Sequence, residues 1–377
     1  MTAPRRGLLL LPLILAACAP RASSSAAPAP APEAAPARRI SALTDEVDRQ
    51  APLWLVRHQV PSVAIAYIRN GRVAWTRVYG EQAPGVPATP ATLYNVASLA
   101  KPVSAETMLR LAAAGRVSLD EPLAGFWVDP DVAADPRHQR LTPRIALSHR
   151  TGFPNWRFQT EGKTLAFQRD PGTTLGYSGE GFEYARRFAQ QKLDAEWESL
   201  ARRYVMGPLR MNSTTYTHPA AAARVALPFG REGRYGEPSV QDSALASDDL
   251  YTTVGDYAAF LTGVIRRDGL PAAYAAQRDS MHVVNEESTA RCDRAAVAHC
   301  PRVGMGLGWE ILEFGGETVR MHSGADWGES TLAFYFAETG DGAVILTNGA
   351  NGMKVSLEAV ELLFPATRLA DYARSFR

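Results

Sequence analysis

Ser98 and Lys101 are the two residues of this sequence whose types and spacing most directly suggest chemistry. They lie in the stretch Tyr94-Asn-Val-Ala-Ser-Leu-Ala-Lys, where Asn95 is a candidate N-cap and the apolar run that follows ends at Gly115, a candidate C-cap. Residues three apart share one face of a helix. A neutral lysine amine, its pKa lowered by burial, can accept a serine proton. The first turn of a helix also favours developing negative charge.

The scarcity of lysine strengthens this interpretation. Of 40 basic residues only four are lysines, namely Lys101, Lys163, Lys192 and Lys354. In a GC-rich genome, codon usage favours arginine over lysine for most positive charges on the surface. Arginine, however, does not deprotonate in proteins. A lysine at position 101 therefore favours proton transfer. Ser-x-x-Lys also arises by chance at helix starts with a solvated lysine, so the motif needs partners.

Two further stretches offer such partners. Tyr177 follows a Pro-Gly turn, and a tyrosine near a lysine ammonium could act as a general base with a lowered pKa. The alternative is a packed aromatic ring. Met321-His-Ser-Gly-Ala precedes a predicted strand. On an edge strand His322 could line a cleft, with Gly324 letting a substrate approach the backbone. The alternative is a structural histidine.

The elements that must position these residues predict an α+β fold. A helix is expected over 41–59, kinked by Pro52, and a hairpin follows with its turn at Asn70-Gly71. Strands are expected over 331–336 and 342–347, and an amphipathic helix over 353–364 closes the chain. Both chain ends would thus complete one antiparallel sheet flanked by helices. The predicted domains are a sheet domain of residues 40–95 plus 250–377 and an inserted, mostly helical domain of residues 96–249.

The N-terminus is typical of an exported lipoprotein. Arg5 and Arg6 precede eleven apolar residues, fewer than the roughly 20 that span a bilayer, so residues 1–17 are expected to be a signal peptide. Leu15-Ala-Ala-Cys resembles a lipobox, which predicts lipidation of Cys18; a plain secretory signal is the alternative. Ala19 favours the outer membrane. Residues 18–39, rich in alanine and proline, would form an extended periplasmic tether.

Cysteine content and charge exclude several classes. In an oxidising periplasm Cys292 and Cys300 are expected to form a disulfide; a metal site with His299 would lack a fourth ligand.

With 46% hydrophobic residues the chain can build a large core. Its net charge of +1 leaves no electrostatic footprint for nucleic acid. No metal or other cofactor is expected, and the membrane would be contacted only through the lipid.

Taken together, the three motifs resemble those of the penicillin-recognising serine hydrolases, in particular the branch of class C β-lactamases, esterases and D,D-peptidases. The resemblance covers residues 40–365. It includes Leu147-Ser-His-Arg-Thr-Gly-Phe-Pro, Pro208-Leu-Arg-Met-Asn-Ser-Thr-Thr-Tyr, Asp249-Leu-Tyr-Thr-Thr-Val-Gly-Asp-Tyr, Gly306-Leu-Gly-Trp and Leu346-Thr-Asn-Gly. It implies the β-lactamase/D,D-peptidase fold.

The resemblance also implies roles in acyl transfer to water through a covalent intermediate. Ser98 would form the acyl-enzyme with Lys101 as its proton partner. Tyr177 would act as general base, and as acid towards the leaving group. His322 would occupy the third-motif lysine position. The N–H groups of Ser98 and Ala325 would form the oxyanion hole, and Ser323, Gly324 and Gly179 would line the substrate site.

Departures from the family pattern affect the expected substrate. Gly179 replaces an asparagine whose amide commonly binds an acylamino side chain, and His322 gives a pH-dependent anchor for a substrate carboxylate. Asp248-Asp249 stands where members of the family often carry two glycines, a change to which no mechanistic role is assigned. The changes at Gly179 and His322 favour an esterase or peptidase-like amidase over a β-lactamase or D,D-carboxypeptidase.

Two further readings belong to other classes. One is a non-catalytic penicillin-binding sensor or scaffold, which intact Ser98, Lys101 and Tyr177 argue against. The other is an α/β-hydrolase, whose nucleophile elbow fails because Glu180 stands where its second glycine belongs.

Overall fold

The structure is a computed structural model that describes residues 34–217, 219, 222–294 and 300–376. The predicted signal peptide, Cys18, Ala19, the first part of the tether and His299 lie outside the described residues. By their contacts, Met1–Ser41 and Ala42–Arg377 form two separate units, and all the described strands belong to the second. None of the described helices is long and apolar enough to cross a membrane. The predicted boundaries between a sheet domain and a helical domain stay a prediction.

An antiparallel sheet built from both ends of this second unit confirms the predicted fold class. Within the described residues it has nine strands in the order β3-β2-β1-β11-β10-β9-β8-β7-β6. The strands are β1 (Ser62–Arg69), β2 (Arg72–Ala83), β3 (Val86–Pro87), β6 (Val283–Val284), β7 (Arg302–Met305), β8 (Glu310–Glu313), β9 (Thr318–Ala325), β10 (Ser330–Phe336) and β11 (Gly342–Thr347). Strand β1 joins the two ends by pairing with both β2 and β11. A separate antiparallel pair joins β4 (Tyr94–Asn95), which shortly precedes Ser98 in the sequence, to β5 (Tyr251–Thr252), which is distant in sequence.

The turn between β1 and β2 is the one predicted. Asn70 and Gly71 take φ values of 49° and 67°, which suit the two-residue turn of a hairpin. The amide N–H of Gly71 also donates to the carbonyl of Gly340, in the turn between β10 and β11. Two neighbouring turns are therefore linked at one end of the sheet.

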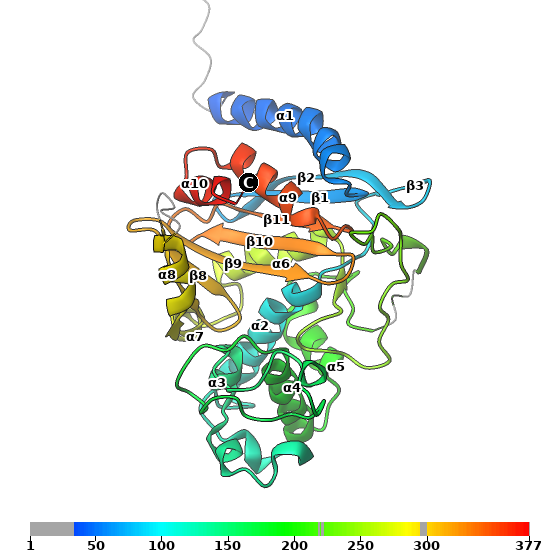
Figure 1. The fold of residues 1–377 in the computed structure, drawn as a ribbon. Coiled ribbons are helices and arrows are strands. Elements are labelled where there is room, and N and C mark those ends of the chain that lie inside the picture. The colour runs from blue at the N-terminus through cyan, green and yellow to red at the C-terminus, as the bar shows by residue number, and fades with distance from the viewer. Residues whose placement is uncertain (1–33, 218, 220–221, 295–299, 377) are drawn as a thin grey trace, which may run out of the picture. The chain divides into compact units, whose positions relative to one another are not determined.

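Helices cover both faces of the sheet (Figure 1). The described helices are α1 (Ala34–His58), α2 (Ala100–Ala113), α3 (Pro143–Leu147), α4 (Gly179–Leu193), α5 (Trp197–Ala201), α6 (Val254–Arg266), α7 (Ala272–Asp279), α8 (Glu286–Arg294), α9 (Gly352–Leu363) and α10 (Arg368–Arg374). Side chains alternate along each strand. Ala64 and Ala66 of β1 join the cluster formed with α2 and α6. On the opposite face, Leu332 and Phe334 of β10 line a cavity against α9 and α10.

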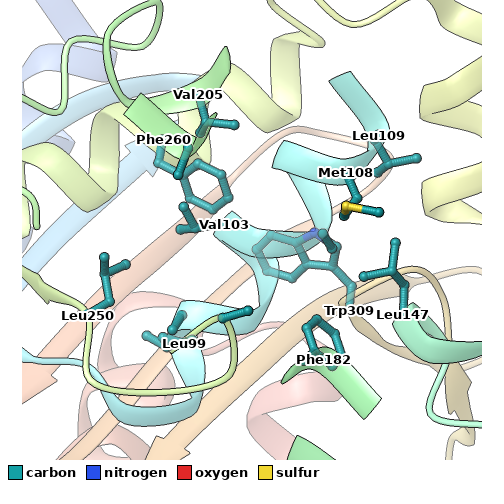
Figure 2. Packing of buried hydrophobic residues seen from close by; sticks show 14 of the residues in the cluster. Leu99, Val103, Met108, Leu109, Leu147, Phe182, Val205, Leu250, Phe260 and Trp309 are labelled. Atoms are coloured by element: carbon teal, nitrogen blue, oxygen red, sulfur yellow. The ribbon is translucent and has the colours of Figure 1, made fainter. Parts of the chain in front are cut away.

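Helix α2 is the centre of the core. Every residue from Ala100 to Ala112 is buried. Figure 2 shows side chains from several separate elements packed around it, among them Phe182, Phe260 and Trp309. Because a close-packed interior allows little displacement of its parts, a helix buried all round gives the serine at its start a fixed position.

Three expectations need correction. Helix α1 begins at Ala34, not at 41, so the end of the predicted extended tether is helical; this segment is rich in alanine, the strongest helix former. Helix α10 follows α9, so the helix expected over 353–364 does not close the chain. The third motif precedes the strand at Thr331 as expected, but it lies in a strand of its own, β9, which is not at the edge of the sheet but between β8 and β10.

Candidate active site

Ser98 lies in a short 3₁₀ turn, Ala97–Leu99, that leads directly into α2. The side-chain carbonyl of Asn95 accepts the N–H of Ala97 at 2.9 Å. Asn95 is not the N-cap that was expected, because the N-cap of this turn is Val96 and that of α2 is Leu99. Ala97 has φ +47°, a left-handed conformation that is uncommon for a residue with a side chain. Such strain persists only where the surroundings impose it, and it is common at active sites.

Lys101 is buried and points at Ser98. Its Nζ donates hydrogen bonds of 2.8 Å to Ser98 Oγ and to the carbonyl oxygen of Ser247. Only 1% of the residue is exposed. Burial lowers the pKa of Lys101 below its ordinary 10.5, while the carboxylates of Asp248 and Glu183 oppose that shift. The predicted contact between the serine and a lysine with a lowered pKa is therefore present.

Tyr177 completes the group around Ser98. Its ring centroid is 4.9 Å from Lys101 Nζ, and its side chain hydrogen-bonds to Ser98. Burial is the largest cause that raises its pKa above 10, although 40% of the residue is exposed to solvent, and the bond to Ser98 opposes the rise. The expectation of a lowered tyrosine pKa is therefore wrong. Lys101 lies over the ring, while Asp248 and Glu310 disfavour the phenolate, so Tyr177 is a neutral phenol at rest.

His149, which was not predicted as a site residue, holds Tyr177 in place. The imidazole stacks on the Tyr177 ring at 4.3 Å between centroids, and its Nδ1 accepts the backbone N–H of Ser178 at 3.0 Å. It is fully buried, and burial together with the charge of Lys101 lowers its pKa well below 6.5. The sequence could have indicated His149, because this residue belongs to the stretch from Leu147 that resembles the family.

His322 faces the same site from β9. It pairs with Ala333 of β10, on the face of the sheet that packs against α2 and α6. Residues from His322 to Ala325 extend beyond the pairing with β8, so this part of β9 forms a local edge within the described sheet. Burial and the charge of Lys101 lower the pKa of His322 to about 3. The imidazole is therefore neutral near pH 7, and the expectation of a pH-dependent anchor for a carboxylate is wrong in that range.

Gly324 has a different role from the one expected. A Cβ at this position would lie 2.2 Å from the carbonyl oxygen of Val96 and 3.1 Å from the amide nitrogen of Ser98. Thr331 Oγ1 donates to the same Val96 carbonyl at 2.9 Å. Because Gly324 has no side chain, the backbone of Val96 and Ser98 can approach β9. This backbone fills the space next to Gly324, so no room is left there for a substrate. The amide nitrogen of Ser98 therefore lies next to Gly324.

Ser178 and Gly179 form the start of α4. Ser178 Oγ donates to the carbonyl of Pro154 and accepts the N–H of Gly181, so this serine is a buried helix cap. Because its hydroxyl both donates and accepts a hydrogen bond in this role, Ser178 is not placed as a nucleophile. This agrees with the conclusion that the sequence around Ser178 is not a nucleophile elbow. The N–H of Gly179 donates to the side chain of Asn155 at 2.9 Å.

A cluster of carboxylates includes Asp248, whose charge acts on both Lys101 and Tyr177. Oxygens of Asp248, Asp249 and Asp326 lie within 4.8 Å of one another, and Glu329 is close enough for Asp326 to raise its pKa. Burial raises the pKa of Asp248, and Lys101 opposes that rise. Each of the three aspartates already accepts a hydrogen bond, from the N–H of its own neighbour or from Asn95. Acidic groups of this kind are common without a metal ion, so the cluster by itself is not assigned as a metal site.

Asp249 adopts a backbone conformation that usually requires glycine. It adopts φ +53°, a conformation that favours glycine, and its carboxylate accepts hydrogen bonds from Asn95 and Gln241. These bonds stabilise a conformation that an L-residue rarely adopts. Asp249 is therefore held in this conformation through its own side chain, whose carboxylate lies within 4.8 Å of those of Asp248 and Asp326.

Cys292 and Cys300 are joined by a disulfide, as predicted, with 5.8 Å between their Cα atoms. The bond closes an eight-residue separation at the end of α8. Its role is local.

The chain belongs to the Beta-lactamase family, whose profile matches residues 37–366. It is a hydrolase of the penicillin-recognising serine hydrolase superfamily. It is 26% identical over 322 residues to penicillin-binding protein 4 of Amycolatopsis lactamdurans, covering 78% of this chain and 82% of that protein. It is 30% identical over 206 residues to esterase EstB of Burkholderia gladioli, covering 52% and 50%. A solved class C β-lactamase superposes with a TM-score of 0.71 at 16% identity, covering 88% of this chain and 98% of that one.

Proposed function

We propose that this chain hydrolyses esters or amides through an acyl-enzyme on Ser98, as an esterase or a peptidase-like amidase. The observation that carries the proposal is the 2.8 Å hydrogen bond between Ser98 Oγ and a buried lysine whose pKa is lowered by that burial. A lysine amine without its extra proton is a base strong enough for serine, and burial is what makes this form accessible near neutral pH.

The first step is attack by Ser98. Neutral Lys101 accepts the hydroxyl proton while Oγ forms a bond to the substrate carbonyl carbon. The negative charge that develops on the carbonyl oxygen is stabilised by the N–H groups of Ser98, in the turn before α2, and of Ala325, at the end of β9. Because Tyr177 is neutral at rest, the role of first proton acceptor falls to Lys101.

The second step expels the leaving group. The phenol of Tyr177 donates its proton to the leaving oxygen or nitrogen as the bond to the carbonyl carbon breaks, and the Lys101 ammonium reprotonates the tyrosine. Deacylation repeats both transfers with water in place of serine, so every proton is returned. His149 stacks on the ring that must move these protons, and neutral His322 contributes no charge.

The choice of esters and amides rests on the departures from the family pattern. The amide expected at position 179 is absent, and His322 is neutral, so two groups that would hold a β-lactam or a peptide carboxylate are missing. The esterase among the relatives agrees with this choice. The penicillin-binding protein and the class C β-lactamase support the alternative substrates, β-lactams or peptidoglycan.

Turnover of p-nitrophenyl acetate and of a chromogenic cephalosporin separates these substrates. We expect the wild type to hydrolyse the ester with repeated turnover and the cephalosporin much more slowly, and Ser98→Ala to lose both activities. Faster turnover of the cephalosporin would assign the chain to the β-lactamases. Equal ester hydrolysis by Ser98→Ala would reject the mechanism.

The pH dependence of the reaction tests the charge on Asp248. In Asp248→Asn the ammonium form of Lys101 loses a stabilising negative charge, so the pKa of Lys101 falls further, although Glu183 remains. Neutral lysine then exists at lower pH. The acid limb of kcat/KM should move down by about one pH unit. The matched control is Asp120→Asn, which changes an exposed aspartate paired with Arg144 and should leave the limb in place. A limb that stays in place or moves up would contradict this account of Lys101.

We also propose that the protein is exported and held at the outer membrane by a lipid on Cys18. The basic and apolar segments before Cys18 support this, and the disulfide between Cys292 and Cys300 is consistent with an oxidising compartment. Cys18→Ser should move the protein from the membrane to the soluble fraction. Ala19→Asp, which keeps the lipidated cysteine, should stay membrane-bound but shift to the inner membrane. Membrane retention of the Cys18→Ser protein would show that no lipid anchors it.

A further inference from the structure

The space that a side chain at position 179 would occupy is filled by an aromatic ring from another part of the chain. A Cβ on Gly179 would lie 2.9 Å from Cη2 and 3.0 Å from Cζ2 of Trp156. Real Cβ contacts are essentially never that short, so the indole occupies the direction in which any side chain at this position would point. Gly179 is two residues beyond Tyr177, and an indole therefore lies where the family-like pattern would present an amide to the acyl group.

Phe158 extends the indole into a larger surface. Its ring is stacked on Trp156 with 5.9 Å between centroids and 15° between planes. Phe158 is 62% exposed, which is unusual for a phenylalanine, and Trp156 is partly exposed. We refer to these two rings as the aromatic shelf.

Arg157, between the two aromatic residues, fixes the shelf to the body of the protein. Its guanidinium forms ion pairs of 2.9 Å with Glu180 and 2.7 Å with Asp129, both of which are buried, and a longer pair with Asp131. Its backbone N–H also donates to Glu180, the residue after Gly179. These bonds tie the loop to the first turn of α4. The shelf is thus preorganised beside the second motif, which lowers the entropy lost on binding.

We propose that the aromatic shelf is the acyl-binding surface of this enzyme, and that its preferred substrates are esters or amides whose acyl group carries an aromatic ring. An indole face offers a large apolar area and favourable stacking for a planar group, and it cannot replace the two polar contacts of an amide. A substrate with a phenylacetyl-type acyl group would place its ring on Trp156 while its carbonyl lies at Ser98. This inference rests on the proposed function, and it names the substrate class for the same site.

The test compares two esters with the same leaving group, p-nitrophenyl phenylacetate and p-nitrophenyl acetate, in the wild type and in Trp156→Ala, Trp156→Phe and Phe158→Ala. We expect the wild type to prefer phenylacetate. Trp156→Ala should lower kcat/KM for phenylacetate about tenfold or more and change acetate by no more than about twofold. Trp156→Phe should keep part of the preference. Phe376→Ala, an exposed phenylalanine of the C-terminal segment that follows α10, is the matched control and should change neither rate.

The ratio between the two esters separates specificity from damage to the fold. A structural defect lowers both rates together, so an unchanged ratio in Trp156→Ala and in Phe158→Ala would overturn the proposal. If Trp156→Ala does not fold, the ratio in Trp156→Phe and Phe158→Ala decides in the same way. Failure of the proposed function has a different signature, because Ser98→Ala would then hydrolyse both esters as fast as the wild type.

Discussion

Replacing Lys101 by arginine is expected to lower kcat/KM for p-nitrophenyl acetate by about 10³-fold or more, although the positive charge is retained. Arginine does not deprotonate in a protein, so it cannot accept the Ser98 proton, and general base catalysis contributes about 10² to 10⁴ in rate. The guanidinium must also fit a site that is only 1% exposed. Steady-state kinetics over a range of pH measures the loss.

The matched control for this substitution is Lys192→Arg. Lys192 pairs with Glu121 at the surface, where arginine forms an equivalent ion pair, so activity should stay within about twofold. Thermal unfolding of both variants shows whether Lys101→Arg is folded. A folded Lys101→Arg protein with more than about a tenth of the wild-type activity would show that this lysine is not the base.

Removing the hydroxyl of Tyr177 is expected to have the second large effect, and the size should depend on the leaving group. Tyr177→Phe keeps the stacking on His149 but removes the proton donor. A p-nitrophenolate leaves without a proton, whereas an alkoxide or an amine requires one. We therefore expect a loss of about 10²- to 10⁴-fold for an alkyl ester or an amide, and a distinctly smaller loss for the p-nitrophenyl ester.

Tyr184→Phe is the control for Tyr177→Phe. Tyr184 is buried, and its hydroxyl accepts the N–H of Asp129, so its loss tests the general effect of deleting a buried phenol oxygen in the same helical region. Equal losses for both leaving groups in Tyr177→Phe would argue against acid catalysis by this residue. They would favour a role in holding Ser98 through the hydrogen bond between the two side chains.

Local signals were sufficient to predict four of the nine described strands of the large sheet, namely β1, β2, β10 and β11. Asn70-Gly71 determines the hairpin because both residues tolerate positive φ, and the apolar runs at 331–336 and 342–347 correspond closely to β10 and β11. Short strands such as β6 and β8 were not predictable, since two to four residues carry no clear periodicity. They form strands because the neighbouring strand supplies the hydrogen bonds. The early start of α1 results from alanine-rich residues that were interpreted as part of a tether.

The site was predictable in its members but not in its electrostatics. Residue types and motif order brought together Ser98, Lys101, Tyr177 and His322, and the structure brings them to one place. Protonation depends on burial and on charges from distant segments, which a motif does not encode. That is why the phenol was expected to be acidic and the imidazole to titrate near neutral pH, and why neither expectation holds.

Contacts between loops distant in sequence account for the remaining omissions. Nothing in the sequence indicates that Trp156 packs against Gly179, since a glycine records only the absence of a side chain. The same limit applies to Gly324, where the sequence suggested access for a substrate and the structure shows access for the backbone of Val96 and Ser98. A glycine in a motif therefore predicts a close approach but does not identify the approaching group.

Covalent labelling of the nucleophile tests the central proposal most directly. Intact mass of the wild type, Ser98→Ala and Ser178→Ala is measured after reaction with a fluorophosphonate, and the labelled peptide is then sequenced. We predict one adduct on Ser98 in the wild type and in folded Ser178→Ala, and none in Ser98→Ala. An adduct that persists in Ser98→Ala, or that maps to Ser178, would contradict the assignment of Ser98 as the nucleophile.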